Sequence, residues 1–333
     1  MMSRSFLASR SASALTPSAA LLVTWASIGG CTGVVTPPST TSAQTVIETD
    51  GGEAPPSTDV ETDPATPSGD AGSSPRDGGA TRDAGRDGGK PPTQRSSGCG
   101  KPGNGSGAFE RRTVRIRDRD RTYHVRIPDD YSATRAYPVV FRFHGIGGDG
   151  LAGGLDIERA TGDDAIVVGA DGVNRGWHGG TQAEDVELFD TMLATLSSSY
   201  CVDVTRVFAY GFSMGGGFTN LLGCLRADKL RATATVAGFD RSDARCAEQP
   251  MASWYQHDQG DPAAPISGGR AARDRVLRRN DCGSETRSAD GCVTYTDCDG
   301  GEPVVWCETQ GLGHDIDGSR APQKVWTFFS SLP

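Results

Sequence analysis

Residues 211–215 carry the most specific chemical pattern in the sequence, because they match G-x-S-x-G. An apolar run that suits a strand, 207–210, precedes them, and a run with helical spacing, 214–225, follows. In such a strand–turn–helix context the serine lies on a tight turn that lifts its hydroxyl above a sheet. The pattern therefore predicts Ser213 as a nucleophile. It also predicts that the Met214 amide, at the start of the helix, donates to a developing oxyanion.

A serine nucleophile needs a general base, and folds that carry this turn place an acid and then the base after the serine. Of the five histidines, two satisfy that order, His257 and His314. His314 lies in a glycine-containing loop between the last expected strand and the last expected helix, at the same sheet edge as Ser213. We therefore expect His314 to be the base, and His257, at the end of a strand, to be a packed or hydrogen-bonded residue.

Three aspartates could orient the base. Asp261 is favoured because it follows Gly260 and precedes Pro262, in a turn after the penultimate strand, where the acid belongs. Asp258 in the same loop and Asp240 after the preceding strand remain open alternatives.

The second oxyanion donor is expected in loop 144–148, which follows an early buried strand and has the sequence HGIGG. Its glycines would let the backbone approach a substrate oxygen, and the Ile146 amide is the candidate donor. His144 is expected to hold this loop rather than to act in catalysis. Trp177 is expected to form an apolar wall for the acyl or alcohol group, with a surface-loop aromatic without such contact as the alternative.

Strand-like and helix-like runs alternate along the chain from residue 99 onwards. A hairpin is expected from strands 113–117 and 122–127 around the turn 118–120. Further strands are expected at 139–143, 166–170, 207–210, 232–236, 253–257 and 304–308, and helices at 183–200, 214–225 and 322–329. This alternation predicts an α/β fold with a mainly parallel central sheet covered by helices on both faces.

These motifs as a set resemble secreted carbohydrate esterase family 1 enzymes, which include feruloyl esterases, acetylxylan esterases and polyhydroxybutyrate depolymerases. The resemblance rests on segments 143–148, 202–207, 211–216, 257–261 and 311–314, together with 280–282 and 295–298, in order and approximate spacing. It implies the α/β-hydrolase fold and an exported serine esterase that works through an acyl-enzyme, with no metal or organic cofactor. The implied substrates are feruloyl or acetyl esters of plant polysaccharide, or short polyhydroxyalkanoate.

Two other readings of the same motifs stay open. One is another serine hydrolase, a peptidase or lipase, on the same fold. The other is a catalytically silent surface-binding module. The remaining histidines and acids show no zinc-like spacing. The partner expected is an ester substrate, which could be polymeric, and the pattern assigns no oligomeric state.

The N-terminus reads as an export signal, because a basic start leads into a short apolar core that ends in small residues before Cys31. That ending resembles the lipobox of bacterial lipoproteins, so residues 1–31 are predicted to be a signal peptide with lipid attached at Cys31. An ordinary cleaved signal is the alternative. Residues 32–98 are rich in Pro, Gly, Asp and Arg and are predicted to form a disordered linker, and 99–333 the esterase domain.

The charge balance excludes nucleic acid as a main partner, because 33 Lys and Arg face 42 Asp and Glu, a net charge of −9. No apolar run is long enough to span a membrane, so a lipid anchor would be the one membrane contact. The nine cysteines indicate an oxidising compartment. Without Cys31 they form an even set, in which the resemblance favours Cys282–Cys298 first and Cys224–Cys246 second.

Overall fold

The computed structural model describes residues 93–333 apart from 244 and 289. The predicted signal peptide, the lipid site at Cys31 and all but the end of the predicted linker lie outside the described residues. Within them, tertiary contacts begin slightly before the expected domain start at Cys99. The carbonyl of Gln94 accepts a hydrogen bond of 2.9 Å from the Val204 amide, and Arg95 forms an antiparallel bridge with Asp203.

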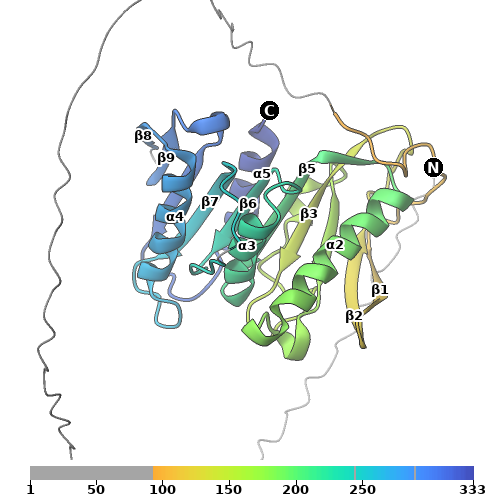
Figure 1. The fold of residues 1–333 in the computed structure, drawn as a ribbon, viewed down its shortest axis with the longest axis horizontal. Helices are drawn as coiled ribbons and strands as arrows, with labels where there is room; N and C mark the ends of the chain where they lie inside the picture. The colour runs from red at the N-terminus through yellow and green to blue at the C-terminus, as the bar shows by residue number, and fades with distance from the viewer. Residues whose placement is uncertain (1–92, 244, 289) are drawn as a thin grey trace, which may run out of the picture. The chain divides into compact units, whose positions relative to one another are not determined.

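Ten strands of the described residues form one sheet in the order β1-β2-β4-β3-β5-β6-β7-β10-β9-β8 (Figure 1). The six strands from β4 to β10 in this order are parallel, and two strands at each edge continue the sheet in antiparallel pairing. The strands are β1 (Phe109–Ile116), β2 (Arg119–Arg126), β3 (Tyr137–Phe143), β4 (Ile166–Ala170), β5 (Val202–Phe212), β6 (Ala232–Val236), β7 (Ala252–Asp258), β8 (Ser284–Arg287), β9 (Cys292–Thr296) and β10 (Val304–Thr309).

Helices cover both faces of this sheet. They are α1 (Glu158–Thr161), α2 (Gln182–Ser199), α3 (Met214–Leu225), α4 (Ile266–Asn280) and α5 (Ala321–Ser331), with short 3-10 turns at Val173–Arg175, Gly179–Thr181 and Asp299–Gly301. Helices α2, α3 and α4 lie on one face, and α5 lies on the other (Figure 1). Because side chains alternate along a strand, β3 serves both layers: Phe141 packs with Phe189 of α2, whereas Val140 belongs to the core beneath α5.

The structure confirms the predicted fold class and most of the predicted elements. Strands β1, β2 and β5 begin three to five residues earlier than predicted, and the other ends differ by at most two residues. Helices α1 and α4 and strands β8 and β9 were not predicted. The buried side of α4 consists mainly of Gly269, Ala272 and Val276, so its apolar periodicity is weak. All four residues of β8 are exposed, which removes the inward–outward alternation by which strands are recognised.

Four disulfides link the eight cysteines of the described domain. They join Cys99 to Cys201, Cys224 to Cys246, Cys282 to Cys298, and Cys292 to Cys307. Both pairings implied by the resemblance are therefore present. Full pairing is typical of proteins of oxidising compartments. No helix in the part of the chain that the structure describes is long and apolar enough to cross a membrane.

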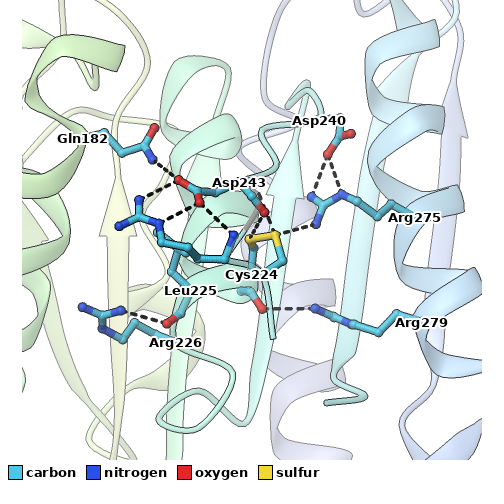
Figure 2. The surroundings of a disulfide bond; sticks show 11 residues. Gln182, Cys224, Leu225, Arg226, Asp240, Asp243, Arg275 and Arg279 are labelled. Atoms are coloured by element: carbon cyan, nitrogen blue, oxygen red, sulfur yellow. Dashed lines mark hydrogen bonds and ion pairs between the residues drawn. A yellow bond between two sulfur atoms is a disulfide. The ribbon is translucent and has the colours of Figure 1, made fainter. Parts of the chain in front are cut away.

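The Cys224–Cys246 disulfide fastens the loop that follows β6 to the last turn of α3. Figure 2 shows Arg275 reaching from α4 toward this disulfide and toward Asp240. The Arg275 guanidinium lies 2.6 Å from the Asp240 carboxylate. The loop after β6 is thus held from α3 by a covalent bond and from α4 by an ion pair.

Candidate active site

Ser213 stands alone between the end of β5 and the start of α3. Its φ of 53° lies in the left-handed region that non-glycine residues seldom adopt. Two neighbouring glycines make the turn possible. A Cβ atom on Gly211 would lie 2.3 Å from the Gly215 carbonyl oxygen, and one on Gly215 would lie 2.1 Å from the Phe143 carbonyl oxygen. The turn thus requires glycine at both positions of G-x-S-x-G, and its geometry is that of the strained strand–turn–helix connection that the pattern predicts.

Ser213, His314 and Asp261 form a continuous hydrogen-bonded chain. His314 Nε2 lies 2.9 Å from Ser213 Oγ, and His314 Nδ1 lies 2.7 Å from Asp261 Oδ2. The loops that carry the three residues follow β5, β10 and β7, so the parallel sheet brings them to the same edge. With the Nδ1 proton donated to the carboxylate, Nε2 is left to accept a proton from the serine hydroxyl.

The Asp261 carboxylate is buried and accepts hydrogen bonds from two backbone amides. Its Oδ1 accepts hydrogen bonds from the Ala263 and Ala264 amides at 2.9 and 2.8 Å. Burial opposes ionisation of this carboxyl group. The hydrogen bonds from Ala264 and His314 outweigh burial and keep the pKa of Asp261 below its ordinary value. The group therefore remains a carboxylate at neutral pH.

The two alternative acids have other partners. Asp258 Oδ2 accepts hydrogen bonds from the Leu312 amide at 2.9 Å and from Thr309 Oγ1 at 3.0 Å. It thereby fixes the start of the loop that carries His314. Asp240 pairs with Arg275, as described above. Of the three aspartates, the one in hydrogen-bond contact with His314 is Asp261.

His257 is packed, as its position at a strand end predicted. It is 1% exposed, and its Nε2 lies 2.7 Å from the Ala264 carbonyl oxygen and 3.4 Å from Asp261 Oδ2. Because a carbonyl oxygen can only accept, Nε2 carries the ring proton. His257 therefore supports the turn that carries Asp261.

The loop at 144–148 lies against the serine turn. A Cβ on Gly145 would lie 3.4 Å from Ser213 Cβ, and Ile146, Met214 and Ser213 line the same pocket. Within the described residues, neither the Ile146 nor the Met214 amide donates to a protein acceptor. Both expected oxyanion donors thus border Ser213, and neither N–H group has an acceptor among the described residues.

The prediction that Trp177 forms an apolar wall for the substrate is wrong. The indole is 1% exposed, stacks on Phe218 with ring centroids 4.7 Å apart, and meets Phe143 edge-on. Its Nε1 donates a hydrogen bond of 2.9 Å to the His144 carbonyl. The loop turns the ring into the core between β3 and α3, because that position both buries the large apolar surface and satisfies its N–H group.

A pocket of about 440 Å³ opens beside Ser213 and falls within the usual range for small-molecule sites. Its lining comprises Ile146, Ser213, Met214, Phe239, Ala263, Ala264, Pro265, Ser267 and Gly268. Phe239 and the lining residues after Asp261 were not predicted from the sequence. Phe239 comes from the loop after β6, Ala263, Ala264 and Pro265 come from the loop after β7, and Ser267 and Gly268 come from the start of α4; no motif marks any of them. Their one sequence signal is that they follow the C-terminal ends of parallel strands, where ligands bind in α/β sheets.

In the described ranges, no group of three or more His, Cys, Asp and Glu side chains is arranged to hold a metal ion. The site chemistry that the structure displays is that of a serine, a histidine, a carboxylate and two amides around an apolar pocket.

Comparison with curated proteins gives relatives over most of the domain. Feruloyl esterase D of Neurospora crassa is 35% identical over 266 residues, which cover 71% of this chain and 90% of that protein. The probable feruloyl esterase C of Aspergillus niger is 34% identical over 254 residues, covering 70% of this chain and 90% of that protein. No family model matches the chain.

Solved structures with the same fold are more distant in sequence. Acetyl xylan esterase from Aspergillus awamori superimposes with a TM-score of 0.54 at 14% identity, covering 67% of this chain and 99% of that chain. A thermostable esterase gives a TM-score of 0.51 at 18% identity, covering 67% of this chain and 62% of that chain. At these identities the likeness concerns the fold, which is that of α/β-hydrolases.

Proposed function

Because the chain belongs to the feruloyl esterase family of carboxylic ester hydrolases, we propose that it is an exported serine esterase acting on feruloyl or acetyl esters of plant polysaccharide. One observation carries the assignment of its machinery: Ser213, His314 and Asp261 form a hydrogen-bonded chain that ends at an apolar pocket. The pocket would take the acyl group, and the alcohol side of the ester would face solvent, where a polymer can be accommodated.

In the proposed acylation step, Ser213 Oγ attacks the ester carbonyl carbon while His314 Nε2 takes the hydroxyl proton. Asp261 stabilises the imidazolium that forms and stays ionised itself. The carbonyl oxygen becomes an oxyanion that the Met214 and Ile146 amides stabilise. His314 then returns its proton to the departing alcohol oxygen, the carbon–oxygen bond breaks, and an acyl-serine remains.

The same groups would serve deacylation. His314 removes a proton from a water molecule, whose oxygen attacks the acyl carbon, and the second oxyanion uses the same two amides. Collapse of that intermediate breaks the bond to Ser213 Oγ, which recovers its proton from His314. The products are a carboxylic acid and the free alcohol of the polymer.

A substrate panel tests the proposed class. The full chain would be assayed on methyl ferulate, acetylated xylan, p-nitrophenyl acetate, short polyhydroxybutyrate and a peptide amide. We expect the highest kcat/KM among the feruloyl and acetyl esters and no cleavage of the amide. Preferential hydrolysis of polyhydroxybutyrate would show that the substrate is a polyester instead of a polysaccharide ester. Faster cleavage of the amide would refute the esterase assignment.

The side chain of Phe239 is expected to contact the acyl group, because it lines the pocket beside Ser213. Replacing it by alanine should raise KM for methyl ferulate about fivefold, since an aromatic contact contributes about 1 kcal/mol. KM for p-nitrophenyl acetate should change less than twofold, because an acetyl group is too small to fill the pocket. Equal changes for both esters would place Phe239 outside the acyl site.

The proposed attachment of lipid to Cys31 rests on the sequence pattern alone. If it holds, the wild-type chain expressed in a bacterium that processes lipoproteins should fractionate with membranes, and Cys31→Ser should release it into the soluble fraction. Esterase activity of the released protein should equal that of the wild type, because the eight remaining cysteines are paired within the catalytic domain. Identical fractionation of the two proteins would favour an ordinary cleaved signal.

A further inference from the structure

We propose that residues 172–177 form a strap that holds the oxyanion loop 144–148, and that Arg175 is a positioning residue for the Ile146 amide. The inference rests on the proposed esterase function, because it concerns the oxyanion site of that reaction. The strap comes from the connection between β4 and α2, whereas the oxyanion loop follows β3. The two segments are separate in sequence and adjacent at the active-site edge of the sheet.

Hydrogen bonds from the strap reach both sides of Ile146. On one side, the Gly172 amide donates to His144 Nε2 at 3.0 Å, and Trp177 Nε1 donates to the His144 carbonyl at 2.9 Å. On the other side, the Gly147 amide donates to the Arg175 carbonyl at 2.7 Å.

The Arg175 side chain adds a further hydrogen bond between the strap and the oxyanion loop. Its Nε donates to the Gly147 carbonyl at 2.6 Å. Arg175 therefore binds both polar groups of Gly147, the amide through its backbone carbonyl and the carbonyl through its side chain. Both polar groups of Gly147, the residue after Ile146, are therefore occupied, while the Ile146 amide has no acceptor among the described residues. This is the arrangement expected for a preorganised oxyanion donor, because no internal hydrogen bond must break when the substrate binds.

The His144 side chain takes part in these hydrogen bonds as a neutral ring. Its Nδ1 donates to the Gly145 carbonyl at 2.7 Å, and its Nε2 accepts from Gly172, so each nitrogen has one role. Burial lowers the pKa of His144, which favours the neutral ring that can accept the Gly172 hydrogen bond.

Backbone strain is the second observation that marks the strap. Asn174 and Arg175 have φ values of 50° and 58°, and both are exposed. Two successive non-glycine residues in the left-handed region are unfavourable, and such strain persists where surrounding contacts impose it. Asn174 and Arg175 are exposed, so packing in the core does not impose their conformation. The hydrogen bonds between Arg175 and Gly147 can impose it, and they lie beside the oxyanion donor.

The test compares two glycine substitutions in the full chain. Both relieve a positive φ, but Arg175→Gly also removes the hydrogen bond from Nε to Gly147, whereas Asn174→Gly leaves every contact with the oxyanion loop intact. We expect Arg175→Gly to lower kcat on methyl ferulate by about 10- to 100-fold, somewhat less than deletion of an oxyanion donor. KM should change less than twofold, and Tm should be equal to or above that of the wild type. Asn174→Gly should keep the wild-type kcat.

Inhibitor binding distinguishes positioning from a general structural effect. An arylboronic acid forms a tetrahedral adduct with the serine and places an oxygen at the oxyanion site, whereas the product ferulate does not require that site. Arg175→Gly should weaken the boronic acid about as much as it lowers kcat, with ferulate affinity unchanged within twofold. Arg175→Met, which keeps the Cβ and removes the donor, should show the same pattern if the glycine variant proves unstable.

The inference is overturned if Arg175→Gly and Arg175→Met keep kcat within twofold of the wild type. It is also overturned if Asn174→Gly loses as much activity, because the turn rather than the Arg175 side chain would then be responsible. An inactive wild type would instead count against the proposed function, so the two failures can be told apart.

Discussion

Ser213→Ala should lower kcat on methyl ferulate by about five to six orders of magnitude, because it removes the atom that forms the acyl-enzyme. Among residues 93–333 apart from 244 and 289, the hydroxyl oxygen has one side-chain partner, His314 Nε2 at 2.9 Å, so its loss should leave Tm within a few degrees of the wild type. Binding of ferulate should persist, since the pocket lining is unchanged. The activity and Tm of the purified variant measure both effects.

Covalent labelling with a fluorophosphonate provides an independent measurement. The wild type should be labelled at Ser213, with loss of fluoride and formation of a phosphorus–oxygen bond, and Ser213→Ala should not be labelled. Labelling of both proteins to the same extent would show that another serine is the nucleophile. Absence of labelling in the wild type would favour the silent binding module over the enzyme.

Asp261→Asn should lower kcat by about four orders of magnitude. An asparagine can present its NH₂ group to His314 Nδ1, which favours the tautomer with the proton on Nε2 and leaves no base for the serine. The matched control is Asp258→Asn, at the end of the preceding strand. Asp258 binds the loop of His314 through Leu312 and Thr309 but does not touch the imidazole, so we expect a kcat loss of about tenfold or less. Equal losses in the two variants would contradict the assignment of Asp261 as the acid.

The low pKa of Asp261 also has a consequence for stability. Its folded-state pKa lies below the ordinary value of 3.8, so the ionised carboxylate stabilises the folded state above that pH. This contribution is lost as the pH falls through the lowered pKa. Urea titrations of wild type and Asp261→Asn should therefore differ most above pH 4 and converge below it. A difference that does not vary with pH would show that the stabilisation does not depend on ionisation.

Much of the fold could be predicted because its elements carry strong local signals. The apolar run of β4 and the helical spacing of α3 depend on residues close together in the chain, and both elements begin and end where the sequence predicts. Helix α4 and strand β8 lack such signals, because their side chains are largely polar or small. Their formation depends on packing against β7 and pairing with β9.

The spatial arrangement of Ser213, His314 and Asp261 was foreseeable for a related reason. Each residue follows a predicted parallel strand, and such strands end at one edge of the sheet. The choice among three aspartates could not be made with the same assurance. Asp258 and Asp261 are three residues apart, and whether one or the other reaches His314 depends on a turn whose geometry follows from the Ala263 and Ala264 amides.

The sequence by itself determined the class of fold, the order of the candidate catalytic residues and the need for glycine around Ser213, because these follow from local periodicity and steric limits. Tertiary structure alone decided that Trp177 is buried, that Phe239 and the start of α4 line the pocket, and that Arg175 grips the oxyanion loop. Each of these depends on contacts between segments far apart in the chain. The energy of such a contact depends on both segments together, so it cannot be predicted from the local sequence of either one.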